Sequence, residues 1–239
     1  MSVDTELTTE TITYPESDGQ PMAENTRQFR WIVTIQGGLD ALFQDAPDVF
    51  VAGDLFWYPV EGQSAICQAP DTMVVFGRPK GDRRSYQQWQ ENNIAPQVVF
   101  EILSPANTLS DMIKKLRFYE RYGVEEYYIY DPDRNDLSGW LRAGAELQEI
   151  PAMPEWVSPR LGVRFAFEAG ELRLYYPDGR RFATYLELEQ QRKQAEQAAE
   201  QERQHAQQER QRAEQEHQRA ERLAARLRAL GIDPDATDQ

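Results

Sequence analysis

Apolar side chains recur at helical intervals between residues 29 and 43, for example at Ile32, Ile35 and Leu39. Intervals of three and four residues place such side chains on one face of a helix, so a helix is predicted here. The Gly37-Gly38 pair interrupts the pattern. It indicates a kink or a close approach by a neighbouring backbone.

A second helix is predicted from about residue 109 to residue 122. Thr108 and Asp111 have the spacing of a capping box at its start, and Gly123 stands where a glycine commonly ends a helix. At 100° per residue its apolar stripe is expected to contain Leu109, Met112, Ile113, Leu116 and Glu120, with Tyr119 at the border as a packing residue.

Short apolar runs bounded by Pro, Gly and Asp are typical of strands. The predicted strands are 49–51 with 55–58, 72–76, 97–103, 127–130, 137–141, 163–167 and 172–176, with a turn over 131–135. The order helix, three strands, helix, strand and meander indicates an α/β (α+β) fold, with a mixed sheet flanked by helices.

The composition changes at about residue 187, where a seven-residue unit begins to repeat. Ala199, Ala206, Ala213, Ala220 and Leu227 are spaced by seven, which is a coiled-coil period. Large apolar side chains are few in this tail, so two interpretations stay open. We favour a helix that self-associates, as a dimer, through its leucine-bearing end; the alternative is a solvated helix held by Glu/Arg pairs.

Four segments follow from these patterns: a polar lead (1–24), a folded domain (25–186), a helical tail (187–230) and a C-terminal end (231–239). The first residues lack the basic and apolar regions of a signal peptide. There is also no run of about 18 apolar residues that would span a membrane. We therefore expect a cytoplasmic protein with no membrane partner.

Composition excludes several kinds of chemistry. His205 and His217 both lie in the polar tail, so the folded domain has no imidazole for triad catalysis or for a histidine-ligated zinc site. Cys67 is the sole cysteine, so no disulfide can form within the chain. The net charge is −14, and −12 of it falls on residues 1–188. Such acidity argues against a generic nucleic-acid coat, although a local basic groove remains compatible with it.

Two carboxylates in predicted strands are the first candidates for chemistry. Asp71 and Glu101 each share a strand face with apolar neighbours, where an unpaired charge is costly. A divalent cation bound between the strands would compensate them, and Mg²⁺ suits such an oxygen-rich site. On the second helix, Lys115 is placed to reach over the sheet, whereas Lys114 is expected to face water.

The order of these motifs resembles the bacterial Uma-type restriction-endonuclease family. The stretches that carry the resemblance are APDTMVVFG (69–77), VVFEILSP (98–105) and DxxxKxxxYxxxGVxEYYIYDPD (111–133). That family belongs to the PD-(D/E)xK nuclease superfamily, and the resemblance covers roughly residues 25–180. It implies a restriction-endonuclease-like fold and hydrolysis of phosphodiester bonds, with nucleic acid, in particular DNA, as the partner.

The resemblance also implies a set of site residues. Mg²⁺, or Mn²⁺ in its place, would be held by Asp71, Glu101 and the Ile102 carbonyl. Leu103 departs from the superfamily pattern, because it stands where the lysine of the ExK motif is expected. In the Uma-type family this lysine commonly comes from the following helix, which here means Lys115. Its role would be to orient the attacking water or to offset charge in the transition state.

Other charged residues carry weaker expectations. Arg78, Lys80, Arg83 and Arg84 follow the strand that Asp71 opens, and they would either contact substrate phosphates or form a solvated basic loop. Asp48 and Asp54 are accessory carboxylates at most. Two functions are weighed: a metal-dependent endonuclease, which we favour, and a non-catalytic scaffold that keeps the fold and self-associates or recruits a partner through its C-terminal helix.

Overall fold

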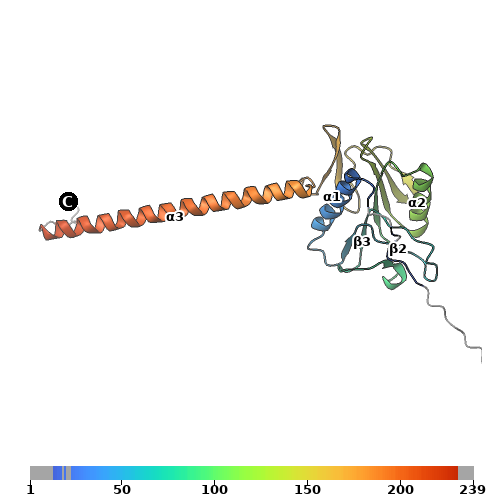
Figure 1. The fold of residues 1–239 in the computed structure, drawn as a ribbon, viewed down its shortest axis with the longest axis horizontal. Coiled ribbons are helices and arrows are strands. Elements are labelled where there is room, and N and C mark those ends of the chain that lie inside the picture. The colour runs from blue at the N-terminus through green and yellow to red at the C-terminus, as the bar shows by residue number, and fades with distance from the viewer. Residues whose placement is uncertain (1–12, 18, 20–22, 231–239) are drawn as a thin grey trace, which may run out of the picture. The chain divides into compact units, whose positions relative to one another are not determined.

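The computed structural model describes residues 13–17, 19 and 23–230. The described residues up to Thr184 form one compact unit, and helix α3 (Tyr185–Ala229) belongs to a second (Figure 1).

A six-stranded mixed sheet forms the centre of the first unit, in the order β1-β3-β5-β6-β7-β8. Strands β5 and β6 are parallel, and every other neighbouring pair in this sheet is antiparallel. The six strands are β1 (Val49–Ala52), β3 (Thr72–Phe76), β5 (Val98–Ile102), β6 (Glu126–Asp131), β7 (Asp136–Ala143) and β8 (Glu146–Glu149). The predicted mixed sheet flanked by helices is confirmed.

Two smaller sheets complete this unit. One is the antiparallel hairpin of β9 (Arg164–Glu168) and β10 (Glu171–Tyr175), and the other pairs β2 (Trp57–Tyr58) with β4 (Tyr86–Gln87), which precedes the short 3₁₀ helix η1 (Gln88–Gln90). The sequence grouped residues 55–58 with the first strand, but β2 lies in a different sheet from β1. The sequence did not predict β4, η1 or β8.

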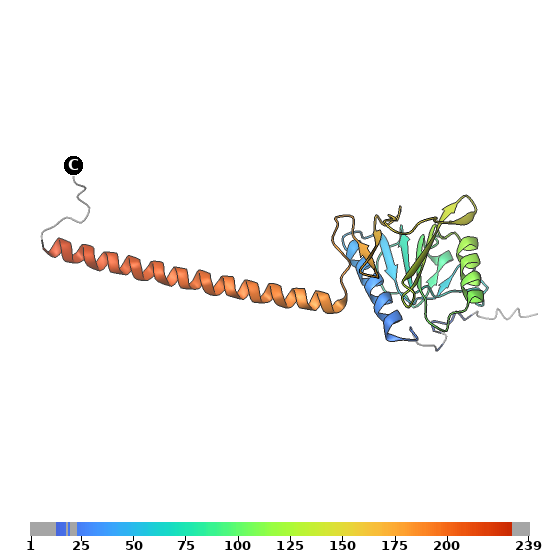
Figure 2. The same cartoon turned by 90° about the horizontal axis from the view of Figure 1, so that it is seen from above.

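Helices α1 (Thr26–Leu42) and α2 (Leu109–Tyr122) cover opposite faces of the large sheet (Figure 2). Side chains alternate between the two faces along each strand. The core under α1 includes Ile35, Leu39, Val74, Phe100 and Tyr128. The core under α2 includes Met73, Val75, Val99, Tyr119 and Tyr127.

Helix α1 runs without interruption through Gly37 and Gly38, so the predicted break is wrong. The prediction of a close approach has a basis at Gly38, but the neighbour is a side chain and not a backbone. A Cβ built on Gly38 would lie 2.1 Å from the ring of Phe182, whereas one on Gly37 would meet nothing within 4 Å. Glycine is therefore needed at position 38 to admit Phe182.

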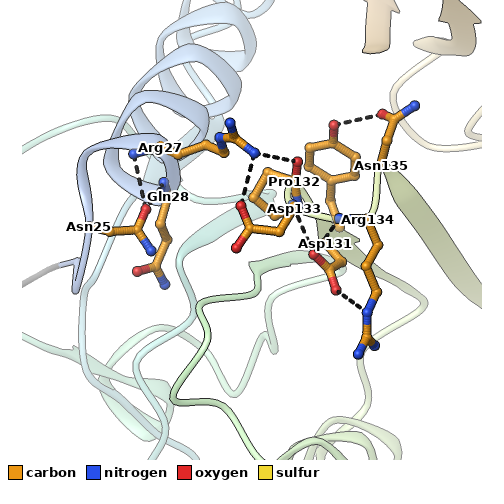
Figure 3. Close-up of polar contacts among 9 residues, drawn as sticks. Asn25, Arg27, Gln28, Asp131, Pro132, Asp133, Arg134 and Asn135 are labelled. Carbon is orange, nitrogen blue, oxygen red and sulfur yellow. Dashed lines mark hydrogen bonds and ion pairs between the residues drawn. The ribbon is translucent and has the colours of Figure 1, made fainter. Parts of the chain in front are cut away.

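The start of α1 is tied to the turn between β6 and β7 (Figure 3). Asn25 caps the helix by accepting the N–H groups of Arg27 and Gln28. The Arg27 guanidinium then pairs with Asp133, at 2.9 Å, and donates to the Pro132 carbonyl. These contacts fix the first turn of α1 near the C-terminal ends of the two parallel strands.

The ends of α2 match the sequence prediction. Thr108 and Asp111 form the capping box, and Gly123 ends the helix with a left-handed φ of 95°. The buried side of the helix differs from the predicted stripe: Tyr119 is 0% exposed, whereas Leu109 is 77% exposed. The helix is therefore rotated so that the side of Tyr119 and Lys115 faces the sheet.

Helix α3 has no buried residue along its whole length, all of which the structure describes. Ion pairs between neighbouring turns support it, for example Arg192 with Glu189 and Glu196. Within the described residues, none of the helices is both long and apolar enough to cross a membrane.

Candidate functional site

Asp71 directly before β3 and Glu101 near the end of β5 lie close together on the sheet surface that faces α2. The antiparallel register pairs Met73 with Val99 on that surface. Asp71, two residues before Met73, and Glu101, two residues after Val99, therefore come next to one another. The Asp71 carboxylate also accepts the backbone N–H of Ile102 at 2.6 Å. The pairing of the two acids that the sequence suggested therefore has a geometric basis.

Glu101 is held at both carboxylate oxygens. The Lys115 ammonium lies 2.7 Å from Oε2, and the Tyr119 hydroxyl donates to Oε1 at 2.5 Å. The Glu101 side chain is 3% exposed and that of Lys115 22% exposed, so the ion pair is largely shielded from water. Lys115 reaches over the sheet as predicted, and Lys114 points to solvent and pairs with Asp111.

The surroundings of the site raise the pKa values of both Asp71 and Lys115. Burial, together with the charge of Glu101, raises the pKa of Asp71 to about 8, against the opposing effects of Lys115 and the Ile102 N–H. Burial alone would lower the pKa of the Lys115 ammonium, but the charges of Glu101 and Asp71 outweigh it and raise that pKa. Additional positive charge would relieve the remaining repulsion between the acids.

The Ile102 carbonyl, expected as a metal ligand, accepts a hydrogen bond from the Gln28 amide at 2.9 Å. Gln28 comes from α1 and is 6% exposed. The sequence interpretation overlooked it, although a signal was present: Gln28 falls on the same helical stripe as Ile32, Ile35 and Leu39, where a polar residue needs a partner. A carbonyl oxygen has two lone pairs, so this bond leaves one for a further contact.

Leu103, which stands in the position of the ExK lysine, packs with Met112 and Leu116 against the core under α2. It helps to dock the helix that carries Lys115. This position of the strand therefore carries an apolar contact to α2, and the cation that pairs with Glu101 comes from Lys115 on that helix.

A pocket opens beside the acids. Asp71 and Lys115 line it, together with Glu24, Asp54, Ser104 and Asn107. Asp54 is exposed, and its charge adds to the upward shift of the Asp71 pKa. Ser104 donates its hydroxyl to Glu24. Asp48 does not line this pocket among the described residues, whereas Asp54 does.

The four basic residues after β3 are each engaged in ion pairs. Arg78 and Arg83 both hold Glu91, at 2.6 and 2.7 Å, with side chains that are mostly buried. Lys80 lies 3.6 Å from Asp40, and Arg84 lies 2.9 Å from Glu16. Arg78 and Arg83 thus stabilise the loop, and contact of these four residues with phosphate stays a prediction.

Glu126 provides a contrast to Glu101, because it too is a fully buried carboxylate on the large sheet. Its oxygens accept the hydroxyls of Ser158 and Tyr128 and the backbone N–H of Arg160. These donors satisfy the group inside the fold, although burial still raises its pKa. Glu126 is therefore a structural carboxylate.

The donor atoms beside Asp71 suit a hard divalent cation. They are oxygens of two carboxylates and one backbone carbonyl, which Mg²⁺ prefers to nitrogen or sulfur. Among the described residues, no three His, Cys, Asp or Glu side chains gather closely enough to hold a metal ion on their own. The Tyr127 hydroxyl is the one buried side-chain polar atom in the described chain without a hydrogen-bond partner. Burial raises the pKa of this hydroxyl, and the charges of Glu101 and Asp71 raise that pKa further.

The chain is similar to two groups of known proteins. The model of the Uma2 family, described as "Putative restriction endonuclease", matches residues 17–175. Among solved structures, the chain is similar to the crystal structure of a putative nuclease belonging to DUF820 from Anabaena variabilis, with 14% sequence identity and a TM-score of 0.42. That match covers 62% of this chain and 84% of the other. No curated protein matches the chain.

Proposed function

The chain belongs to the Uma2 family of putative restriction endonucleases, and from this premise we propose that it hydrolyses phosphodiester bonds in DNA with the help of a divalent cation. The observation that carries the proposal is that Asp71, Glu101 and Lys115 lie together where β3 begins and β5 ends. A buried acid that is paired with an amine, next to a second, half-buried acid, is typical of a site built for a further cation.

Asp71, Glu101 and the Ile102 carbonyl would hold Mg²⁺ or Mn²⁺. When bound, the ion supplies Lewis acidity toward a phosphate oxygen and lowers the pKa of water. The Ile102 N–H fixes the Asp71 carboxylate, and Gln28 fixes the Ile102 carbonyl, so both oxygens are oriented in advance. Such fixed positions are required of metal-binding groups.

Lys115 has two roles in this proposal. Its ammonium pairs with the Glu101 carboxylate, 2.7 Å from Oε2. It also lines the pocket beside Asp71, where it would orient the attacking water and stabilise the negative charge that develops on the phosphate. Burial of the pair strengthens both effects, because the local dielectric is lower than that of water.

Plasmid nicking with Mg²⁺ or Mn²⁺ tests the proposal. Asp71→Asn and Glu101→Gln are expected to lower nicking at least about 100-fold, since each removes a charge from the site. Asp48→Asn is the matched control: Asp48 also follows a proline and opens a strand, but it is exposed and outside the pocket. Equal nicking by wild type and both site variants would refute the nuclease proposal.

The exposed helix α3 favours a second role, in protein–protein contact. A helix that is polar around most of its surface gains little stability from packing in a single chain. We propose that α3 self-associates through its leucine-bearing end, where Leu223 is 52% and Leu230 76% exposed. Light scattering should show a dimer that dissociates in the Leu223→Glu/Leu230→Glu variant but persists with Ala198→Glu. A monomeric wild type at high concentration would contradict this role.

A further inference from the structure

The described part of the N-terminal lead lies along the site pocket. Pro15 and Ser17 line the same pocket as Asp71 and Lys115. The Pro15 carbonyl accepts a hydrogen bond from the Tyr58 hydroxyl at 2.5 Å. The lead is therefore part of the wall of the candidate site.

Tyr14 is inserted among aromatic rings at this wall. Its ring centroid lies 5.2 Å from that of Tyr58, edge to face, and 5.0 Å from that of Trp89. The Gly62 N–H donates to its hydroxyl at 2.6 Å. Phe56, 6.0 Å from Tyr58, extends the aromatic surface into the pocket. The rings form a continuous surface from η1 to the site.

Glu16 follows two residues later and pairs with Arg84 at 2.9 Å. The Arg84 side chain is 85% exposed, so this pair lies at the protein surface. Arginine pairs with phosphates as it does with carboxylates, so Arg84 is also suited to a phosphate.

We infer that the groove under residues 14–16 binds a single-stranded nucleic acid, and that the lead occupies it as an internal mimic. The Tyr14 ring takes the place of a base against Tyr58 and Trp89, and the Glu16 carboxylate takes the place of a phosphate on Arg84. The inference rests on the proposed function, because the groove leads into the pocket of Asp71 and Lys115.

The chemistry of the groove selects an unpaired strand. In a duplex the base faces stack on one another, whereas an unpaired base can stack on an aromatic ring of the protein. The overall charge of −14 opposes a polyanion, so stacking must supply most of the binding energy, with Arg84 holding one phosphate. Because the lead competes for the groove, it lowers the apparent affinity of the intact chain for the strand.

Fluorescence anisotropy of the full chain with a short labelled oligodeoxynucleotide tests the inference. EDTA is present throughout, so that neither metal binding nor cleavage affects the result. Tyr14→Ala is expected to bind the single strand about tenfold more tightly than wild type. Thr13→Ala, one residue earlier and exposed, is the matched control and should leave affinity unchanged. Adding Trp89→Ala to Tyr14→Ala should abolish the gain.

Glu16→Gln provides a second variant at an exposed position, and it keeps the test open if Tyr14→Ala fails to fold. It should tighten binding a few-fold at low salt and less at high salt. The inference is overturned if both lead variants bind no better than wild type, if a duplex of the same sequence gains as much, or if the gain survives loss of Trp89. Failure to nick plasmid DNA together with failure to cleave a single-stranded oligodeoxynucleotide in Mg²⁺ would instead count against the proposed function, since the binding test requires no catalysis.

Discussion

Asp71→Asn is expected to stabilise the fold while abolishing the proposed activity. Burial and the charge of Glu101 raise the pKa of Asp71 from 3.8 to about 8. A carboxyl group whose pKa is higher in the folded chain stabilises the fold fully below its unfolded pKa, and this contribution is lost as pH rises through the folded pKa. One pKa unit corresponds to about 1.36 kcal/mol. The rise in the pKa of Asp71 therefore lowers the free energy of unfolding by about 5 kcal/mol above pH 8.

Urea unfolding in EDTA at two pH values measures this penalty. Asparagine keeps a carbonyl oxygen that can accept the Ile102 N–H, which lies 2.6 Å from the carboxylate in the native chain. The change therefore removes the ionisation and little else. We expect the variant to be more stable than wild type by several kcal/mol at pH 8.5, and by about 1 kcal/mol at pH 4.5.

Added Mg²⁺ should narrow the difference in stability between the two proteins. Wild type would gain about 2.7 kcal/mol at a Mg²⁺ concentration 100 times its Kd, whereas Asp71→Asn would gain little. If the variant is no more stable than wild type at pH 8.5, or if its advantage is the same at both pH values, the desolvated acidic pair is not a source of strain. Equal Mg²⁺ stabilisation of both proteins would show that Asp71 is not a ligand.

Further predictions concern the amine of the site and the glycines of α1. Lys115→Met leaves the buried Glu101 carboxylate without its cation, so urea unfolding should show a loss of about 3 kcal/mol and nicking should fall at least about 100-fold. Unchanged stability and activity would exclude Lys115 from both roles. Gly38→Ala brings a methyl group against Phe182 and should cost about 1–3 kcal/mol, whereas Gly37→Ala points into open space and should stabilise by about 0.5–1 kcal/mol. Thermal unfolding of the Gly37→Ala and Gly38→Ala variants measures this difference. Equal changes in their stability would contradict the packing described for α1.

Local signals explain which elements the sequence predicts well. The capping box at Thr108 and the glycine at position 123 define α2 through backbone hydrogen bonds that depend on neighbouring residues alone. Strand β3 has the predicted bounds because it is a continuous apolar run. The alternation of side chains along β3 and β5 also predicts which neighbours share a face with Asp71 and which with Glu101. The register that brings the two acids together becomes known only from the pairing of the strands.

Local sequence patterns do not predict features that depend on contacts between distant parts of the chain. The need for Gly38 arises from Phe182, and the roles of Gln28 and Tyr119 arise from hydrogen bonds to β5. Tyr119 was expected to be a packing residue, because helical periodicity records its apolar ring and not the partner of its hydroxyl. The pairing of Arg78 with Glu91 likewise appears only when the loop is folded.

The parallel pairing of β5 with β6 across α2 has a consequence for how the protein folds. Glu101, Lys115 and Tyr119 all come from this single βαβ unit, so they meet through short loop closure. Asp71 joins them from an earlier strand by antiparallel pairing. We therefore expect Lys115, Tyr119 and Glu101 to assemble as one early folding nucleus. Asp71 would join them later, when β3 docks.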